Sequence, residues 1–120
     1  MPSKILIVDD SPATVRLIQT MLDEGGYASV GLNDPARLEQ TIDSERPGLI
    51  LMDVVMPQRN GFQACRELKQ HALYKKIPLI FVTSKSSASD KFWGEQQGAD
   101  GHVAKPFTSE ELLKAVRRFV

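Results

Sequence analysis

Short apolar runs alternate along this chain with segments of helical periodicity, and this alternation limits the folds that the chain can adopt. Residues 4–8, 49–52 and 78–82 are almost continuously apolar, as expected of strands buried on both faces of a sheet. Residues 28–32 and 101–104 are weaker or shorter runs of the same kind. Strands that alternate with helices favour a parallel sheet. We therefore predict an α/β protein with a doubly wound five-stranded parallel sheet and five helices in a three-layer α/β/α arrangement.

Helix start and stop signals separate the apolar runs. Ser11-Pro12 and Asp34-Pro35 each place a capping side chain before a proline suited to the first helical position. The segment 108–111, Thr-Ser-Glu-Glu, is a capping box that opens the last helix. Asn60-Gly61 is interpreted as a turn before the third helix, and Gly98 as the end of the fourth. These signals predict one helix after each strand.

Five polar residues stand where the apolar runs end. Asp9 and Asp10 follow the first run, Asp53 the third, Thr83 the fourth and Lys105 the fifth. Ligands of open α/β sheets bind beyond the carboxyl ends of the strands. We therefore expect these residues to converge at one edge of the sheet, although they span almost the whole chain.

The chemistry of this set points to a divalent cation and a phosphoryl group. Three carboxylates held close together repel one another, and a hard cation removes that conflict. Mg²⁺ suits the set because it takes a few oxygen ligands and keeps several waters. Lys105 adds a compact positive charge, and the Thr83 hydroxyl can donate a hydrogen bond to a phosphoryl oxygen.

Composition excludes several classes of protein. Lys plus Arg and Asp plus Glu are 15 each, so there is no basic excess of the kind that nucleic-acid-binding proteins carry, and no DNA partner is predicted. No run approaches the roughly 18 apolar residues of a membrane helix. Cys65 is the one cysteine, which fits a reducing compartment. We therefore predict a cytoplasmic protein that does not bind a membrane.

Other interpretations apply to some of these residues. Asp10 with Ser11-Pro12 can serve only to cap a helix. Phe92 and Trp93 on the fourth helix are interpreted as core or half-buried packing in preference to a cofactor site, and Cys65 as a buried apolar residue.

Taken together, the motifs resemble those of response-regulator receiver domains. The matching residues are Asp9-Asp10, Asp53 with Met56-Pro57, Val82-Thr83-Ser84 and Lys105-Pro106-Phe107. Residues 90–99 are similar to single-domain regulators of twitching motility or phototaxis, of the PilG/PilH type. The resemblance covers Lys4 to Val120. It implies a flavodoxin-like, CheY-like fold with strand order 2-1-3-4-5, in which residues 1–120 form a single receiver domain without an output domain.

The resemblance also implies roles for the site residues. Asp53 would be the phosphoacceptor, with a histidine kinase or phosphotransfer protein as the phosphoryl donor. Asp10, Asp53 and the backbone carbonyl of Val55 would bind Mg²⁺, and Asp9 would act through a metal-bound water. Lys105 and Thr83 would bind the phosphoryl group, and the Lys105–Pro106 bond would be cis.

His102 belongs to the switch set with Thr83 and Lys105, because it stands where the family usually has a switch Tyr or Phe. We interpret it as a half-exposed ring that fills the place of that aromatic; the alternatives are a residue that contacts a partner and one that makes signalling mildly pH-sensitive. Val55 and Lys85 are expected to modulate the site. The docking face for a downstream protein would include Phe92, Trp93, His102 and Phe107.

The function that follows is that of a two-component response regulator, in motility or taxis, which signals by phosphorylation-dependent protein docking. Such a protein is a self-phosphorylating acceptor that loses its phosphoryl group by autodephosphorylation, not a turnover enzyme, and a monomer or weak dimer. One alternative is a phosphorelay intermediate that passes the phosphoryl group onward. Another is an Mg²⁺-dependent aspartyl phosphohydrolase, which the adjacent Asp9 and Asp10 and the short chain disfavour.

Overall fold

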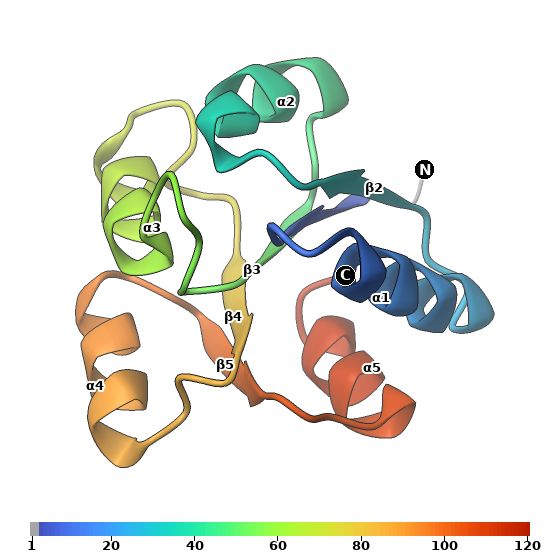
Figure 1. The fold of residues 1–120 in the computed structure, drawn as a ribbon. Helices are drawn as coiled ribbons and strands as arrows, with labels where there is room; N and C mark the ends of the chain where they lie inside the picture. The colour runs from blue at the N-terminus through green and yellow to red at the C-terminus, as the bar shows by residue number, and fades with distance from the viewer. Residues whose placement is uncertain (1–2) are drawn as a thin grey trace.

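The computed structural model describes residues 3–120, so residues 1 and 2 of the predicted domain lie outside the described part of the chain. Five parallel strands form one sheet in the order β2-β1-β3-β4-β5, which confirms the predicted fold class and strand order (Figure 1). The strands are β1 (Ile5–Val8), β2 (Ser29–Leu32), β3 (Leu49–Met52), β4 (Leu79–Thr83) and β5 (Gly101–Ala104).

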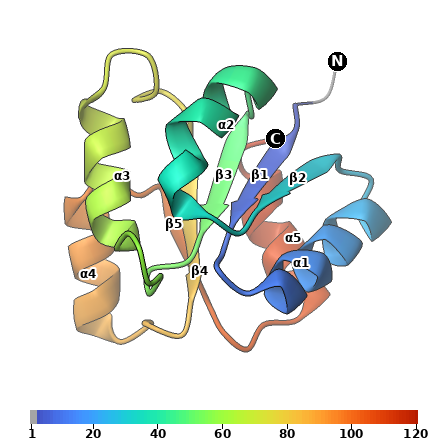
Figure 2. The same cartoon turned by 45° about the horizontal axis from the view of Figure 1, so that its top comes forward.

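Helices cover both faces of this sheet. They are α1 (Pro12–Glu24), α2 (Leu38–Glu45), α3 (Gly61–Gln70), α4 (Ala88–Gln96) and α5 (Ser109–Arg117). Figure 2 shows α1 and α5 on one side of the strands and α2 and α3 on the other. The core is accordingly divided into two clusters: one contains Ile18 of α1 and Leu112 of α5, the other Ile42 of α2 and Leu68 of α3. Within residues 3–120 there is no helix with the length and apolar character that crossing a membrane requires.

Two predicted boundaries differ from the structure. The proline after Asp34 opens a short 3-10 helix, η1 (Pro35–Arg37), before α2 begins, because Asp34 caps only the tight first turn. Asn60-Gly61 is not a separate turn. The Asn60 side chain accepts hydrogen bonds from the amides of Phe62 and Gln63, so it is the N-cap of α3.

The expectation that Phe92 and Trp93 are core or half-buried packing residues is wrong. Their exposed fractions are 61% and 52%, whereas Gly94 is the buried residue of α4. The backbone of α4 approaches the sheet at Gly94, where an added Cβ would lie 3.3 Å from the Phe81 ring. Because contact is made through a glycine, the neighbouring aromatic side chains project into solvent.

Cys65 is a buried apolar residue, as predicted. Its side chain is inaccessible on α3, and burial, with a smaller contribution from Asp100, raises the pKa of the thiol to about 12 despite the opposing charge of Lys69. At neutral pH the thiol is therefore protonated and a poor nucleophile.

Candidate functional site

The residues that follow β1 and β3 are held in register by the sheet itself. The amide of Asp9 donates to the carbonyl of Leu32, and the amide of Asp53 donates to the carbonyl of Val8. These bonds bring the carboxylates of Asp9, Asp10 and Asp53 to one place, with one oxygen of each within 4.8 Å of the others. The predicted convergence of the three acidic residues at the carboxyl edge is therefore confirmed.

Lys105 lies between two of these carboxylates. Its Nζ is 2.8 Å from Asp9 Oδ2 and 3.1 Å from Asp53 Oδ2, while its backbone amide donates to the carbonyl of Thr83. Burial alone would lower the pKa of Lys105, but the hydrogen bond that Lys105 donates to Asp9 and the charges of Asp53 and Asp9 outweigh burial and raise the pKa. The ammonium therefore stays charged. The Lys105–Pro106 bond is cis, as the resemblance implied.

The remaining oxygens of the buried carboxylates bind backbone amides. Asp9 Oδ1 accepts from the amide of Ser11 at 2.9 Å, and Asp53 Oδ1 accepts from the amide of Val54 at 2.7 Å. Asp10 is exposed. The cap of α1 is Ser11, whose hydroxyl accepts from the amide of Thr14, so capping does not account for the position of Asp10 in the acidic cluster.

This donor set fits a hard divalent cation. Three carboxylates and one ammonium leave two uncompensated negative charges in a partly buried place. Oxygen atoms are the ligands that Mg²⁺ prefers, and exposed Asp10 leaves an open side for water.

Thr83 ends β4 at the same edge. It is completely buried, and its Oγ1 accepts a hydrogen bond from the amide of Lys85 at 3.1 Å. That bond uses a lone pair of the hydroxyl oxygen, so its proton can be donated to another acceptor. Thr83 is therefore both an anchor for the β4–α4 loop and a hydrogen-bond donor at the strand end.

Sequence reasoning missed the part that Gly61 plays. A Cβ at this position would lie 2.2 Å from the carbonyl oxygen of Asp53 and 2.8 Å from the Cα of Val54. The Gly61 amide donates to the Val54 carbonyl at 2.7 Å. The start of α3 is thus packed directly against the backbone of Asp53, and only glycine fits there. A glycine immediately after a capping Asn60 was the available signal.

Arg59 is a second residue that sequence reasoning missed. From the β3–α3 loop its guanidinium makes a bidentate pair with Glu39 of α2, at 2.8 and 2.7 Å, and contacts Glu67 of α3 at 2.9 Å. The hydrogen bond from Arg59 lowers the pKa of Glu39. Arg59 therefore ties the loop after Asp53 to two helices.

His102 on β5 is half-buried, as predicted. Its Nε2 lies 2.9 Å from the carbonyl of Lys85, and its ring is 6.1 Å from that of Phe81. Burial lowers the pKa of His102, and the charge of Lys91 adds to this effect; the Lys85 carbonyl and Asp90 oppose it. His102 therefore links β5 to the loop that follows Thr83.

The remaining predicted site and docking residues differ in exposure. Val55, two residues after Asp53, has an exposed fraction of 59%, and Lys85 is exposed as well. Phe92 and Trp93 are exposed on α4, whereas Phe107 packs partly against the core beside α5. The four residues predicted as a docking face are thus not equally accessible.

The comparisons with known proteins agree with this geometry. The family model of the response regulator receiver domain matches residues 5–117. Protein PilH of Pseudomonas aeruginosa is 40% identical over 95% of this chain and 94% of its own length, and protein PilG of the same organism is 32% identical over 98% and 87%. The solved structure of chemotaxis protein CheY4 of Vibrio cholerae has a TM-score of 0.91 at 30% identity, covering both chains fully. The chain also spans about half the length of several curated transcriptional regulators that it matches.

Proposed function

The chain belongs to the response regulator receiver domain family, and we propose that Asp53 is the residue through which it receives a phosphoryl group. The observation that carries this proposal is the position of Asp53. Its carboxylate lies against Lys105 and within 4.8 Å of the other two acidic groups at the end of β3. Asp53 thus lies beside a cation that can pair with phosphoryl oxygens and beside carboxylates that can bind a metal ion.

The donor would be a phosphohistidine of a histidine kinase or phosphotransfer protein. A carboxylate oxygen of Asp53 attacks the phosphorus, the phosphorus–nitrogen bond breaks, and the imidazole leaves with its electron pair and takes a proton. The product is an acyl phosphate on Asp53. The Lys105 ammonium would pair with the new phosphoryl oxygens, and its 2.8 Å contact with Asp9 keeps it in place.

Asp10, Asp53 and the backbone carbonyl of Val55 would hold Mg²⁺, with Asp9 acting through a bound water. When bound, the ion offsets the repulsion between the carboxylates and the incoming phosphoryl group. The exposed side of Asp10 and the exposed Val55 leave room for donor and water. Val55 and Lys85 would then modulate how readily water reaches the acyl phosphate in autodephosphorylation. The chain acts as an acceptor and not as a turnover enzyme.

The signal would leave the site through the β4–α4 loop. The Thr83 hydroxyl can donate to a phosphoryl oxygen, and the same hydroxyl anchors the amide of Lys85. The Lys85 carbonyl in turn contacts His102 on β5. A shift of this loop would change the surface around Phe92 and Trp93, whose exposure favours docking of a downstream protein.

We further propose that this signalling serves motility or taxis and that residues 1–120 act as a single domain. The compartment would be the reducing cytoplasm, because a reducing environment suits the free thiol of Cys65.

The test is incubation with a small phosphodonor such as acetyl phosphate, followed by intact-mass measurement. We expect the mass of one phosphoryl group to be added in the presence of Mg²⁺ and not to be added when the ion is chelated before the phosphodonor is supplied. Asp53→Asn should remove the addition because an amide cannot form the acyl phosphate. Asp43→Asn, an exposed substitution on α2, is the matched control and should leave the addition unchanged. A mass gain that persists in Asp53→Asn would contradict the proposal.

A further inference from the structure

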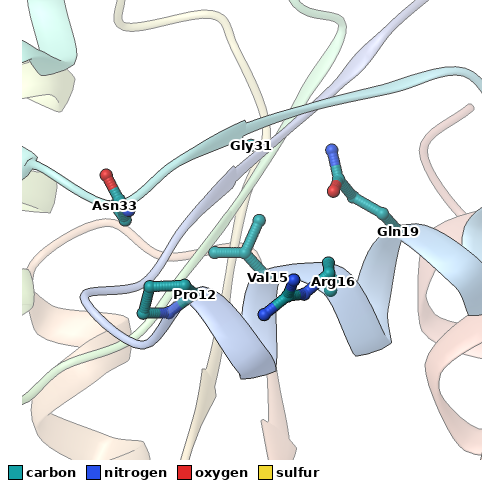
Figure 3. A pocket seen from close by; sticks show the side chains of 6 residues that line it. All are labelled: Pro12, Val15, Arg16, Gln19, Gly31 and Asn33. Carbon is teal, nitrogen blue, oxygen red and sulfur yellow. The ribbon is translucent and has the colours of Figure 1, made fainter.

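A groove runs along the outer side of the sheet between α1 and β2. Figure 3 shows one part of it, a hollow of about 320 Å³ lined by Pro12, Val15, Arg16, Gln19, Gly31 and Asn33. A second hollow of about 440 Å³ is lined by Gln19, Thr20, Asp23, Tyr27, Ala28 and Ser29. The two hollows share Gln19, and they border β2 near its two ends, at Ser29 and at Gly31.

The backbone of β2 is open along this groove. β2 is one of the two edge strands of the sheet, and within residues 3–120 no strand pairs with its outer side. The amides of Ile5 and Asp9 donate to the carbonyls of Ala28 and Leu32. Because backbone groups alternate in direction along a strand, Ser29 and Gly31 direct their amides and carbonyls outward. β2 contains none of the lysines or prolines that protect edge strands from pairing.

Gly31 lets α1 pack closely over β2. A Cβ at Gly31 would lie 2.4 Å from Val15 and 3.2 Å from the Gln19 amide nitrogen, so α1 lies directly over a strand position without a side chain. The close neighbour of this glycine is therefore α1 of the same chain. The adjacent residue, Val30, lies on the opposite face of β2, is partly buried, and supplies an apolar side chain at the centre of the strand.

The charges on α1 are arranged so that a second copy would complement them. Arg16 and Asp23 are seven residues apart, on the same side of the helix, and lie at opposite ends of the groove. Both are exposed, and neither forms an ion pair with any residue between positions 3 and 120. A twofold axis that passes beside the middle of β2 relates two copies in opposite directions. The Arg16 end of the groove in each copy then lies next to the Asp23 end of the groove in the other.

We propose that the open edge of β2 is the surface on which a second copy of this chain docks. The two β2 strands pair antiparallel about a twofold axis at Val30, which continues the five-stranded sheets into one sheet of ten strands. In this register Ser29 of each copy faces Gly31 of the other, and their outward amides and carbonyls form two pairs of backbone hydrogen bonds. The two Val30 side chains meet at the centre, and Arg16 and Asp23 pair at both ends. The proposal requires no phosphoryl chemistry, so it stands independently of the role of Asp53.

A short edge strand and exposed ion pairs give a weak dimer, so the test is made over a range of protein concentration. Sedimentation velocity from micromolar to millimolar protein should show a reversible dimer. Arg16→Asp and Asp23→Arg should each remove it, because each places like charges at both ends of the interface. An equimolar mixture of the two variants should restore dimers, because every end then joins an Asp to an Arg. Arg66→Asp, at an exposed position of α3, changes the charge as much as Arg16→Asp and should leave the dimer unchanged.

Amide hydrogen exchange by NMR locates the interface without a substitution. The amides of Ser29 and Gly31 should gain protection as the protein concentration rises, while amides on α5 remain as they were. A protein that is monomeric at millimolar concentration overturns the proposal. It is also wrong if a dimer forms without protection of Ser29 and Gly31, or if the mixed variants fail to associate; the dimer would then use another face. Circular dichroism checks that each variant is folded.

Discussion

The helices that follow β3 and β4 both begin beside the candidate site, but they are attached to the sheet very differently. α3 buries Gly61, Ala64, Cys65 and Leu68, and the loop before it is fixed by buried Met56 and by the ion pairs of Arg59. α4 contacts the core through Gly94, and it leaves Phe92 and Trp93 in solvent.

The loop before α4 is fixed by fewer contacts. The amide of Lys85 binds the Thr83 hydroxyl, and the Lys85 carbonyl binds His102. Both contacts are single hydrogen bonds, whereas the loop before α3 is fixed by a buried side chain and by ion pairs. The α3 side of the site is thus firmly attached to the fold, while the α4 side can shift more easily, as the proposed signalling route requires.

The largest expected difference concerns side-chain truncation on the two helices. Leu68→Ala on α3 should lower the free energy of unfolding by about 3 kcal/mol, because it removes a buried side chain and leaves a cavity. Phe92→Ala on α4 should change it by less than about 0.5 kcal/mol, because the ring is mostly exposed. Urea unfolding followed by circular dichroism measures both. Equal losses of stability in Leu68→Ala and Phe92→Ala would contradict the difference in how α3 and α4 are attached to the sheet.

The two buried glycines make a second comparison. Gly61→Ala should destabilise the fold by about 2 kcal/mol, because its Cβ meets the backbone of Asp53, which cannot move aside. The Cβ that Gly94→Ala adds lies 3.3 Å from the Phe81 ring. The better helix propensity of alanine, about 1 kcal/mol, offsets that contact, so the free energy of unfolding should change little. The same unfolding measurement applies, and a Gly94→Ala variant less stable than Gly61→Ala would contradict this assignment of close contacts.

Removing an ion pair beside α3 should lower the free energy of unfolding slightly more than removing one beside α4. Arg59→Met removes the bidentate pair with Glu39 and should cost about 1 kcal/mol, a modest value because Glu39 is partly exposed and solvent screens the pair. Lys85→Met removes a 3.9 Å contact with Asp90 and should be neutral. Unfolding at low and at high salt checks this prediction: the cost of Arg59→Met should shrink with salt, and a salt-independent cost would count against an ionic origin.

The smallest expected effect is the pH dependence that His102 contributes. Burial lowers the pKa of His102 in the folded protein, so the unfolded chain binds a proton more readily than the folded chain. Stability should therefore fall as the pH drops from the ordinary histidine value near 6.5 toward the lowered folded pKa. His102→Asn should remove that part of the pH dependence in thermal melts made between pH 7 and pH 5. NMR titration of the ring would contradict the account if the folded pKa were raised.

Much of this architecture could be predicted because its causes are local in sequence. Apolar runs such as residues 49–52 and caps such as Ser11 indicate their own structure, and strand ends bring Asp9, Asp53 and Lys105 to one edge. The close approach of Gly61 to Asp53 was not predictable, because it depends on where α3 packs. For Trp93 the sequence supported two conflicting expectations, because the resemblance placed it on a docking face whereas an aromatic residue on a helix usually packs. Nothing in the sequence shows that α4 touches the sheet through Gly94, which leaves Trp93 exposed.

The central claim is that Asp53 accepts the phosphoryl group at this site. Borohydride reduction of the phosphorylated protein converts an aspartyl phosphate to homoserine, and peptide mass spectrometry then locates the converted residue. The account predicts homoserine at position 53, formed only with both phosphodonor and Mg²⁺, and absent from the Asp53→Asn variant. Conversion at Asp9 or Asp10, or a phosphorylated protein that yields no homoserine, would contradict it.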